Sequence, residues 1–144
     1  MCCTFFGHKD TFGIEKNDIK TAIVELIERQ GVRKFYVGNN GRFDCLVQNA
    51  LCELSNTYPD IEYYIVLAYI SEQAMSGHQH TTIYPEGLEF CPLRYAISKR
   101  NEWMINHSKY VITYMQKTYT NCYKWVEKAR RKGLEIINLA LGKT

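Results

Sequence analysis

The stretch Phe35-Tyr-Val-Gly-Asn-Asn-Gly-Arg-Phe-Asp44 decides the fold of this chain. Its first three residues are aromatic or β-branched and favour a strand. Gly38 to Gly41 form a turn of residue types that tolerate positive φ, and helical apolar spacing begins at Phe43. Backbone N–H groups and the positive end of a helix dipole then meet at this turn. The stretch therefore predicts a site for a phosphate or carboxylate; the alternative is a plain connection that binds nothing.

Strand and helix patterns alternate on both sides of this stretch. The spacing of apolar residues, with glycine, proline and capping residues at the ends, predicts helices that start at Asp18, Phe43, Pro92 and Thr120 or Asn121. Strands are predicted at 2–6, 35–37, 61–70, 110–115 and 134–139. The 61–70 run is apolar enough for a central strand covered on both faces. This order predicts an α/β fold: a Rossmann-like three-layer sandwich whose mostly parallel sheet has about five strands, with helices on both faces.

Length and composition predict one domain over residues 1–144. The chain is 46% hydrophobic and has no repeat or linker-like segment. Its net charge of +3 is too small to indicate a nucleic-acid-binding face, which argues against nucleic acid as a partner. We expect a cytoplasmic protein, because the N-terminus does not resemble a signal peptide and no apolar run is long enough for a membrane span. Six cysteines without metal-like spacing predict reduced thiols, with a Cys45–Cys52 redox switch as the alternative.

Two further features bear on function. Residues 71–91 lose all periodicity and contain His78 and His80, which favours a functional or mobile loop. Two histidines are fewer than a zinc site needs, so we predict no metal. Arg100 falls on an otherwise apolar helical stripe, where it would recognise a carboxylate or phosphate beside a pocket. The alternatives are that it snorkels to solvent or pairs with a nearby acid such as Glu102 or Glu89.

The candidate loops converge on one edge of the predicted sheet. Residues 8–10, 38–44 and 116–121 each follow a strand. Ligands of open parallel sheets bind outside the carboxyl ends of the strands, at the switch point. The convergence of these loops therefore favours a pocket over a plain connection.

Several motifs resemble a known family. CCTFFGHKD, FYVGNNGRFD, YPDIEYYIVLAY, ISKRNEWMINHSKYVITY and KGLEIINL resemble, in order and spacing, small bacterial and phage proteins of the SLOG superfamily. This Rossmann-like group includes the Smf/DprA proteins and the cytokinin-activating LOG enzymes. The resemblance covers nearly the whole chain and rests on the combined GHxD, GxxGxFD and RNxWM pattern.

The resemblance implies a nucleotide or nucleotide-derived ligand at the first glycine turn. The expected ligand-binding residues are Gly7, His8, Asp10, Gly38, Asn39, Asn40, Gly41, Phe43, Asp44, Arg100, Asn101, Thr118 and Tyr119. One departure is important. Many relatives have a second glycine-rich phosphate turn after the fourth strand, with PGGxGTxxE in LOG enzymes. This chain has KTYTNCY at 117–123 instead, without glycine or glutamate, which argues against close phosphate contact and LOG-type hydrolysis; Tyr119 or Tyr123 would stack on a base.

The function predicted from these observations is the sensing or sequestering of a nucleotide-derived small molecule without turnover. SLOG domains in bacterial immunity bind ADP-ribose-type signals, so the resemblance implies an ADP-ribose-type or cyclic nucleotide immune signal and an anti-defence role. It also implies a homo-oligomer; no cofactor and no catalytic residue is predicted. The alternative is a hydrolase of an N-glycosidic bond that uses Asp10, Asp44 or Glu86. Gly38→Val is expected to abolish ligand binding while the fold survives.

Overall fold

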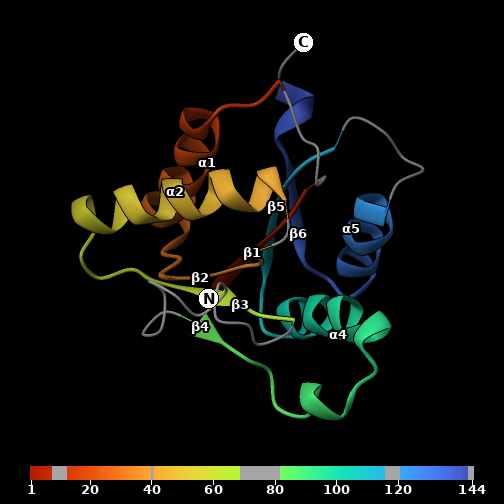
Figure 1. The fold of residues 1–144 in the computed structure, drawn as a ribbon. Helices are drawn as coiled ribbons and strands as arrows, with labels where there is room; N and C mark the ends of the chain where they lie inside the picture. The colour runs from red at the N-terminus through yellow and green to blue at the C-terminus, as the bar shows by residue number, and fades with distance from the viewer. Residues whose placement is uncertain (8–12, 40, 69–81, 116–120, 143–144) are drawn as a thin grey trace.

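The computed structural model describes residues 1–7, 13–39, 41–68, 82–115 and 121–142. It is an α/β fold built on one six-stranded sheet in which every strand pair is parallel (Figure 1). The strands are β1 (Cys2–Gly7), β2 (Lys34–Val37), β3 (Glu62–Val66), β4 (Thr82–Ile83), β5 (Tyr110–Tyr114) and β6 (Glu135–Asn138). The described α-helices are α1 (Lys16–Gln30), α2 (Arg42–Thr57), α4 (Leu93–Asn106) and α5 (Asn121–Arg131), with 3₁₀ turns η1 (Leu88–Phe90) and η2 (Leu139–Gly142).

The strand order is β4-β3-β2-β1-β5-β6, so β1 lies inside the sheet. From β1 the chain adds β2, β3 and β4 on one side, and it then returns through α4 to place β5 on the other side. The order reverses between β1 and β5, which makes the gap between their carboxyl ends the switch point where such sheets bind ligands.

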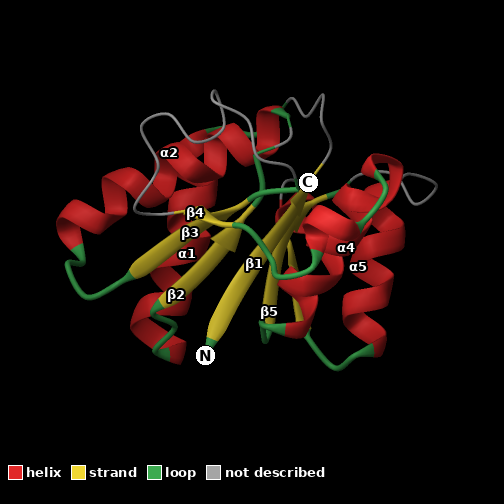
Figure 2. Cartoon of the chain, turned by 60° about the horizontal axis from the view of Figure 1, so that its bottom comes forward, coloured by secondary structure: helices red, strands yellow, loops and turns green. Residues whose placement is uncertain are grey.

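Two apolar cores cover the two faces of the sheet. Because successive strand residues point to opposite faces, alternate residues of each strand enter different cores. Helices α1 and α2 pack on the face that carries Cys3, Phe5, Phe35, Val37 and Ile65. Helices α4 and α5 pack on the face that carries Phe6, Tyr36, Val66, Val111 and Met115. Figure 2 shows the sheet between these two helical layers. The predicted three-layer Rossmann-like architecture is therefore confirmed.

The buried faces predicted from apolar spacing are confirmed for α1 and α2, whereas Leu93, predicted on the buried stripe of α4, is 75% exposed. In α1 the buried residues are Ile19, Ala22, Ile23, Leu26 and Ile27. The α1 start was wrong by three residues: Glu15 is the N-cap, and its backbone N–H donates to the Asp18 carboxylate at 3.0 Å. Asp18 is thus the N3 partner of a capping box and not the N-cap.

The sheet departs from prediction at its β4 edge. The sixth strand, β4, has only two residues and lies within a stretch predicted to have no regular structure. It pairs with β3, whose Ile65 and Val66 lie opposite Thr82 and Ile83. The strand β3 is therefore next to the edge and not central, and it ends at Val66. Tyr63 and Tyr64 on it are only half-buried, because amphipathic rings tolerate partial exposure near a sheet edge.

Candidate functional site

The carboxyl edge of the sheet brings together segments that are far apart in sequence. Gly7 ends β1, Gly38 follows β2 directly, and the Val66 carbonyl ends β3. Since all strands are parallel, these three positions lie at the same edge. The predicted turn at 38–44 therefore starts at the expected edge, one strand away from the switch point.

Two charged side chains occupy the space beside Gly38. A β-carbon at this position would lie 2.6 Å from Arg100 Nη1 and 2.9 Å from Asp44 Oδ2. Gly38 has no positive φ, so the expected conformational reason for this glycine was wrong. Its physical requirement is space, because any side chain here would displace the guanidinium or the carboxylate. Gln48 Nε2 donates to the Gly38 carbonyl at 2.9 Å and fixes the peptide from the other side.

Arg100 is a buried cation at this edge. Its side chain is 4% exposed; Nε donates to Asn101 Oδ1 at 2.9 Å and Nη1 donates to the Val66 carbonyl at 3.3 Å. The predicted inward orientation from helical spacing is therefore correct, and snorkelling is excluded. Glu102, one of the acids considered as a partner, forms ion pairs with Lys128 and Lys99. A buried guanidinium is costly unless hydrogen bonds and an opposite charge compensate it, so Arg100 ties α4 to the ends of β2 and β3.

Asp44 brings negative charge to the same place. It lies in the first turn of α2, where the helix dipole favours an anion, and it is 9% exposed. Its charge is also felt on the α5 side of the sheet. Burial raises the pKa of the Cys122 thiol, a hydrogen bond with the Thr113 hydroxyl lowers it, and the Asp44 carboxylate raises it further. The Thr113 Oγ1 to Cys122 Sγ distance is 3.5 Å.

Gly7 is required by packing against the start of α2. A β-carbon at position 7 would lie 2.7 Å from the Phe43 β-carbon and closer still to its ring. Phe43 is 1% exposed and belongs to the α1–α2 core. The structure therefore gives both residues a packing role: this contact sets how closely the N-terminus of α2 approaches the end of β1.

The other predicted site residues divide into two groups. Asn39 is exposed; Gly41 is the N-cap of α2 with φ of 109°, a value that glycine adopts readily; and Asn101 is buried as the acceptor for Arg100. Gly38 and Asp44 from the turn segment therefore lie together with Arg100 and Asn101 from α4. The remaining predicted residues lie outside the described part of the chain: His8, Asp10, Asn40, Thr118 and Tyr119.

The half-buried Asn138 at the end of β6 makes contacts that the sequence did not predict. Its amide Oδ1 accepts the Met115 N–H at 3.0 Å, and its Nδ2 donates to the Met115 carbonyl at 3.0 Å. Oδ1 also accepts the Ala140 N–H at 3.1 Å. The side chain therefore continues the β5–β6 ladder by one step and fixes the point where the chain leaves β5. An asparagine directly after an apolar run is the only signal in the sequence.

Neither a metal site nor a membrane span is present among the described residues. They contain no group of three or more histidine, cysteine or acidic side chains placed to hold a metal ion. His78 and His80 lie outside these residues. No described helix is both long and apolar enough to cross a bilayer.

Glu86, considered above as a catalytic carboxylate, lines a different pocket. That pocket involves η1 and the outer flank of α4, and its lining includes neither Gly38 nor Asp44. The structure therefore does not place Glu86 with the turn residues.

The parallel sheet, its strand order and its glycine-lined carboxyl edge define a Rossmann-like α/β protein. No family model matches the chain, and no curated protein matches it in sequence. Among solved structures, DNA processing protein A (DprA) from Streptococcus pneumoniae is similar with a TM-score of 0.68 over 93% of this chain, at 14% identity. This chain spans about half of that protein, 48% of its length. The predicted Rossmann-like fold is confirmed and resembles that of DprA, and at this identity the likeness concerns the fold alone.

Proposed function

We propose that the protein binds a nucleotide-derived small molecule at the carboxyl edge of its sheet and senses or sequesters it without turnover. The observation that carries this proposal is the buried Arg100 guanidinium, held against Gly38 beside the N-terminus of α2. A fixed positive charge, a helix dipole and a turn without side-chain bulk favour an anionic group at one point. An ADP-ribose-type or cyclic nucleotide signal carries such a group.

The roles of the two charges follow from their positions. The Arg100 guanidinium lies beside Gly38 and would raise the positive potential at the backbone amides of the turn. Asp44 limits that potential and supplies a carboxylate, the group that accepts hydrogen bonds from ribose hydroxyls in Rossmann-like sites. A phosphate paired with a ribose therefore fits this arrangement better than inorganic phosphate does.

Capture fits the arrangement better than cleavage. Cleavage of an N-glycosidic bond by the usual route uses two carboxylates across the bond. Asp44 shares its space with Arg100, and Glu86 belongs to another pocket. The described residues near Gly38 therefore supply one carboxylate with a cation beside it, which suits binding of a sugar phosphate. Assembly with further copies of the chain and an anti-defence role remain part of this proposal.

The direct test is mass spectrometry of small molecules released by denaturing protein purified from its native host. Recovery of an intact nucleotide derivative supports capture, whereas free base and a sugar phosphate in its place contradict the absence of turnover. In a thermal-shift assay, ADP-ribose and cyclic dinucleotides are expected to stabilise the protein, whereas adenosine, which has no phosphate, is not. Arg100→Gln should remove the shift, and Arg94→Gln, an exposed arginine on the same helix, should retain it.

Two results would overturn the proposal. The first is an unchanged thermal shift in Arg100→Gln, provided that the variant is folded by circular dichroism. The second is steeply salt-dependent affinity for single-stranded DNA with no affinity for any nucleotide, because that dependence marks contacts to a polyphosphate backbone.

A further inference from the structure

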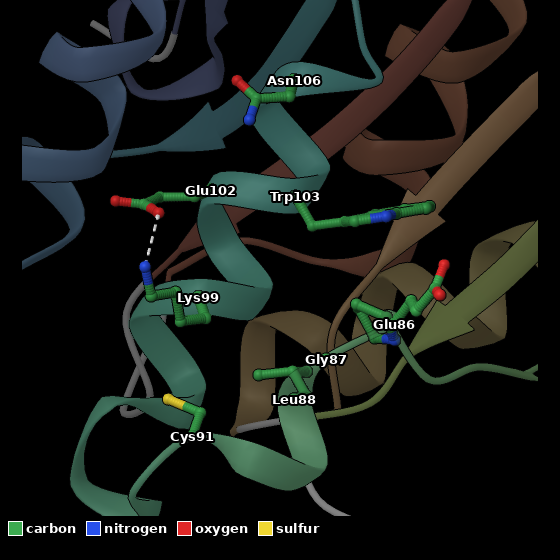
Figure 3. A pocket seen from close by; sticks show the side chains of 9 residues that line it. Glu86, Gly87, Leu88, Cys91, Lys99, Glu102, Trp103 and Asn106 are labelled. Atoms are coloured by element: carbon green, nitrogen blue, oxygen red, sulfur yellow. Dashed lines mark ion pairs between the residues drawn. The ribbon is translucent and has the colours of Figure 1, made fainter.

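A second pocket lies between η1 and the outer flank of α4. It has a volume of about 350 Å³, within the range of small-molecule sites. Figure 3 shows its lining: Leu88, Gly87 and Cys91 from the η1 side, and Lys99, Glu102, Trp103 and Asn106 from α4. Pro85 and Glu86 complete it. Nothing in the proposed function uses this pocket.

The Trp103 indole ring is a fixed wall of the pocket. His107 stacks on it with ring centroids 4.0 Å apart, and Tyr36 contacts it edge-on at 5.1 Å. The stacked His107 ring covers one face of the indole, and the Tyr36 ring lies roughly perpendicular to it, so the two contacts hold the indole in place. In Figure 3 the ring extends toward Glu86, which also lines the pocket. The indole N–H has no hydrogen-bond partner among the described residues.

The two acidic residues that line the pocket differ in their ion pairs. Glu102 pairs with Lys128 at 2.8 Å and with Lys99 at 3.9 Å. Figure 3 shows the Lys99–Glu102 pair on the side away from the Trp103 ring. In contrast, the Glu86 carboxylate has no ion pair or hydrogen bond within the described segments, and it lies on the same side as the indole ring. On the ring side of the pocket, no described residue compensates the negative charge of Glu86.

We propose that this pocket binds a guanidinium group, carried by a small molecule or by an arginine side chain of a polypeptide. A planar guanidinium stacks on the Trp103 ring and pairs with the Glu86 carboxylate through its fork of N–H donors. Leu88 gives apolar contact to the alkyl chain that bears it. An anion is disfavoured on this side by Glu86, and a neutral ring gains stacking alone.

The test uses the indole N–H signals of the two tryptophans in a ¹⁵N-labelled sample. Titration with N-acetyl-arginine amide should shift the Trp103 signal saturably, while the Trp125 signal, from a buried ring in the α5 core, stays in place. N-acetyl-citrulline amide has the same shape without the charge and should give no saturable shift. Equal shifts with both compounds, or shifts of both tryptophans together, would overturn the proposal.

Matched variants test the residues. Glu86→Gln should weaken binding of the arginine amide by roughly tenfold or more, because it removes a charge-assisted hydrogen bond. Glu89→Gln, an exposed acid three residues away that does not line the pocket, should have no effect. Lys99→Met should tighten binding, since it removes a like charge from the lining. Equal affinities of the Glu86 and Glu89 variants would refute the assignment.

The source of the guanidinium is decided by two further ligands. Agmatine represents a free small molecule, and a Gly-Gly-Arg-Gly-Gly peptide represents a polypeptide side chain. A Trp103 shift with agmatine alone assigns the site to small molecules, and a shift with the peptide alone assigns it to a protein partner. If neither ligand shifts the Trp103 signal, the pocket is not a guanidinium site.

Discussion

Gly38→Ala tests whether the packing of Arg100 and Asp44 against Gly38 stabilises the fold. The new β-carbon would lie 2.6 Å from Arg100 Nη1 and 3.0 Å from its Cζ, so the guanidinium has to move. Its movement stretches or breaks the 3.3 Å hydrogen bond to the Val66 carbonyl. Overpacking of this kind costs about 1–3 kcal/mol. With the urea dependence usual for small proteins, the unfolding midpoint should fall by roughly 1 M.

Gly7→Ala supplies the comparison within the same edge. Its β-carbon would meet the Phe43 ring, which is locked in the core and cannot swing away as the end of an arginine can. The loss in free energy of unfolding should therefore be larger than for Gly38→Ala, at or above the top of the about 1–3 kcal/mol range. Urea denaturation followed by circular dichroism measures both variants.

Double-mutant cycles then identify the contacts. Combining Gly38→Ala with Arg100→Met should recover about 1–2 kcal/mol relative to the sum of the two single effects, because the clashing group is gone. Gly7→Ala combined with Phe43→Leu should show coupling of the same sign, and the crossed pairs should be additive. Additivity of the Gly38–Arg100 pair, or coupling in the crossed pairs, would refute the packing argument.

Three further outcomes follow from individual contacts. Asn138→Ala should destabilise the protein by about 1–3 kcal/mol, because the Met115 backbone groups lose their partners, and hydrogen exchange at the Met115 amide should accelerate. A hydrogen bond from Lys128 lowers the pKa of Glu102 below its ordinary 4.5. This pair therefore stabilises the fold above pH 4.5, and its contribution disappears as the pH falls through the lowered pKa. The difference in free energy of unfolding between wild type and Lys128→Met should shrink from pH 6 to pH 3. Burial raises the pKa of Cys122, so iodoacetamide should label that thiol only after unfolding, as peptide mass spectrometry would show.

The sequence was most informative where periodicity and burial coincide. The apolar positions of α2 at Phe43, Val47, Ala50, Leu51 and Leu54 are all buried, as predicted. Each turn of a helix repeats the same signal, so an error at one position does not change the predicted face. The parallel sheet followed from the alternation of these helices with strands, which leaves few topologies open.

Short elements and contacts between distant segments could not be predicted from the sequence, for a physical reason. The strand β4 has two residues, too few for any alternation to register, and it is defined by pairing with β3. The pocket beside Trp103 joins η1 to residues of α4 that lie several turns further along the chain. Its identity depends on which side chains tertiary packing leaves unpaired, and no local pattern reports that.

For Arg100, local periodicity predicted the burial of the side chain but not its tertiary contacts. Helical spacing placed it on a buried stripe, and it is 4% exposed. Helical spacing could not predict which groups surround the guanidinium. Those groups come from the ends of β2 and β3 and from the start of α2, which are far from Arg100 in sequence. If the guanidinium served packing alone, Arg100→Met with Asp44→Asn, which removes both charges, should cost little or even stabilise, as replacement of buried ion pairs often does. A stable double variant without the nucleotide-dependent thermal shift would assign the pair to ligand binding, whereas a stable double variant that keeps the shift would place the site elsewhere.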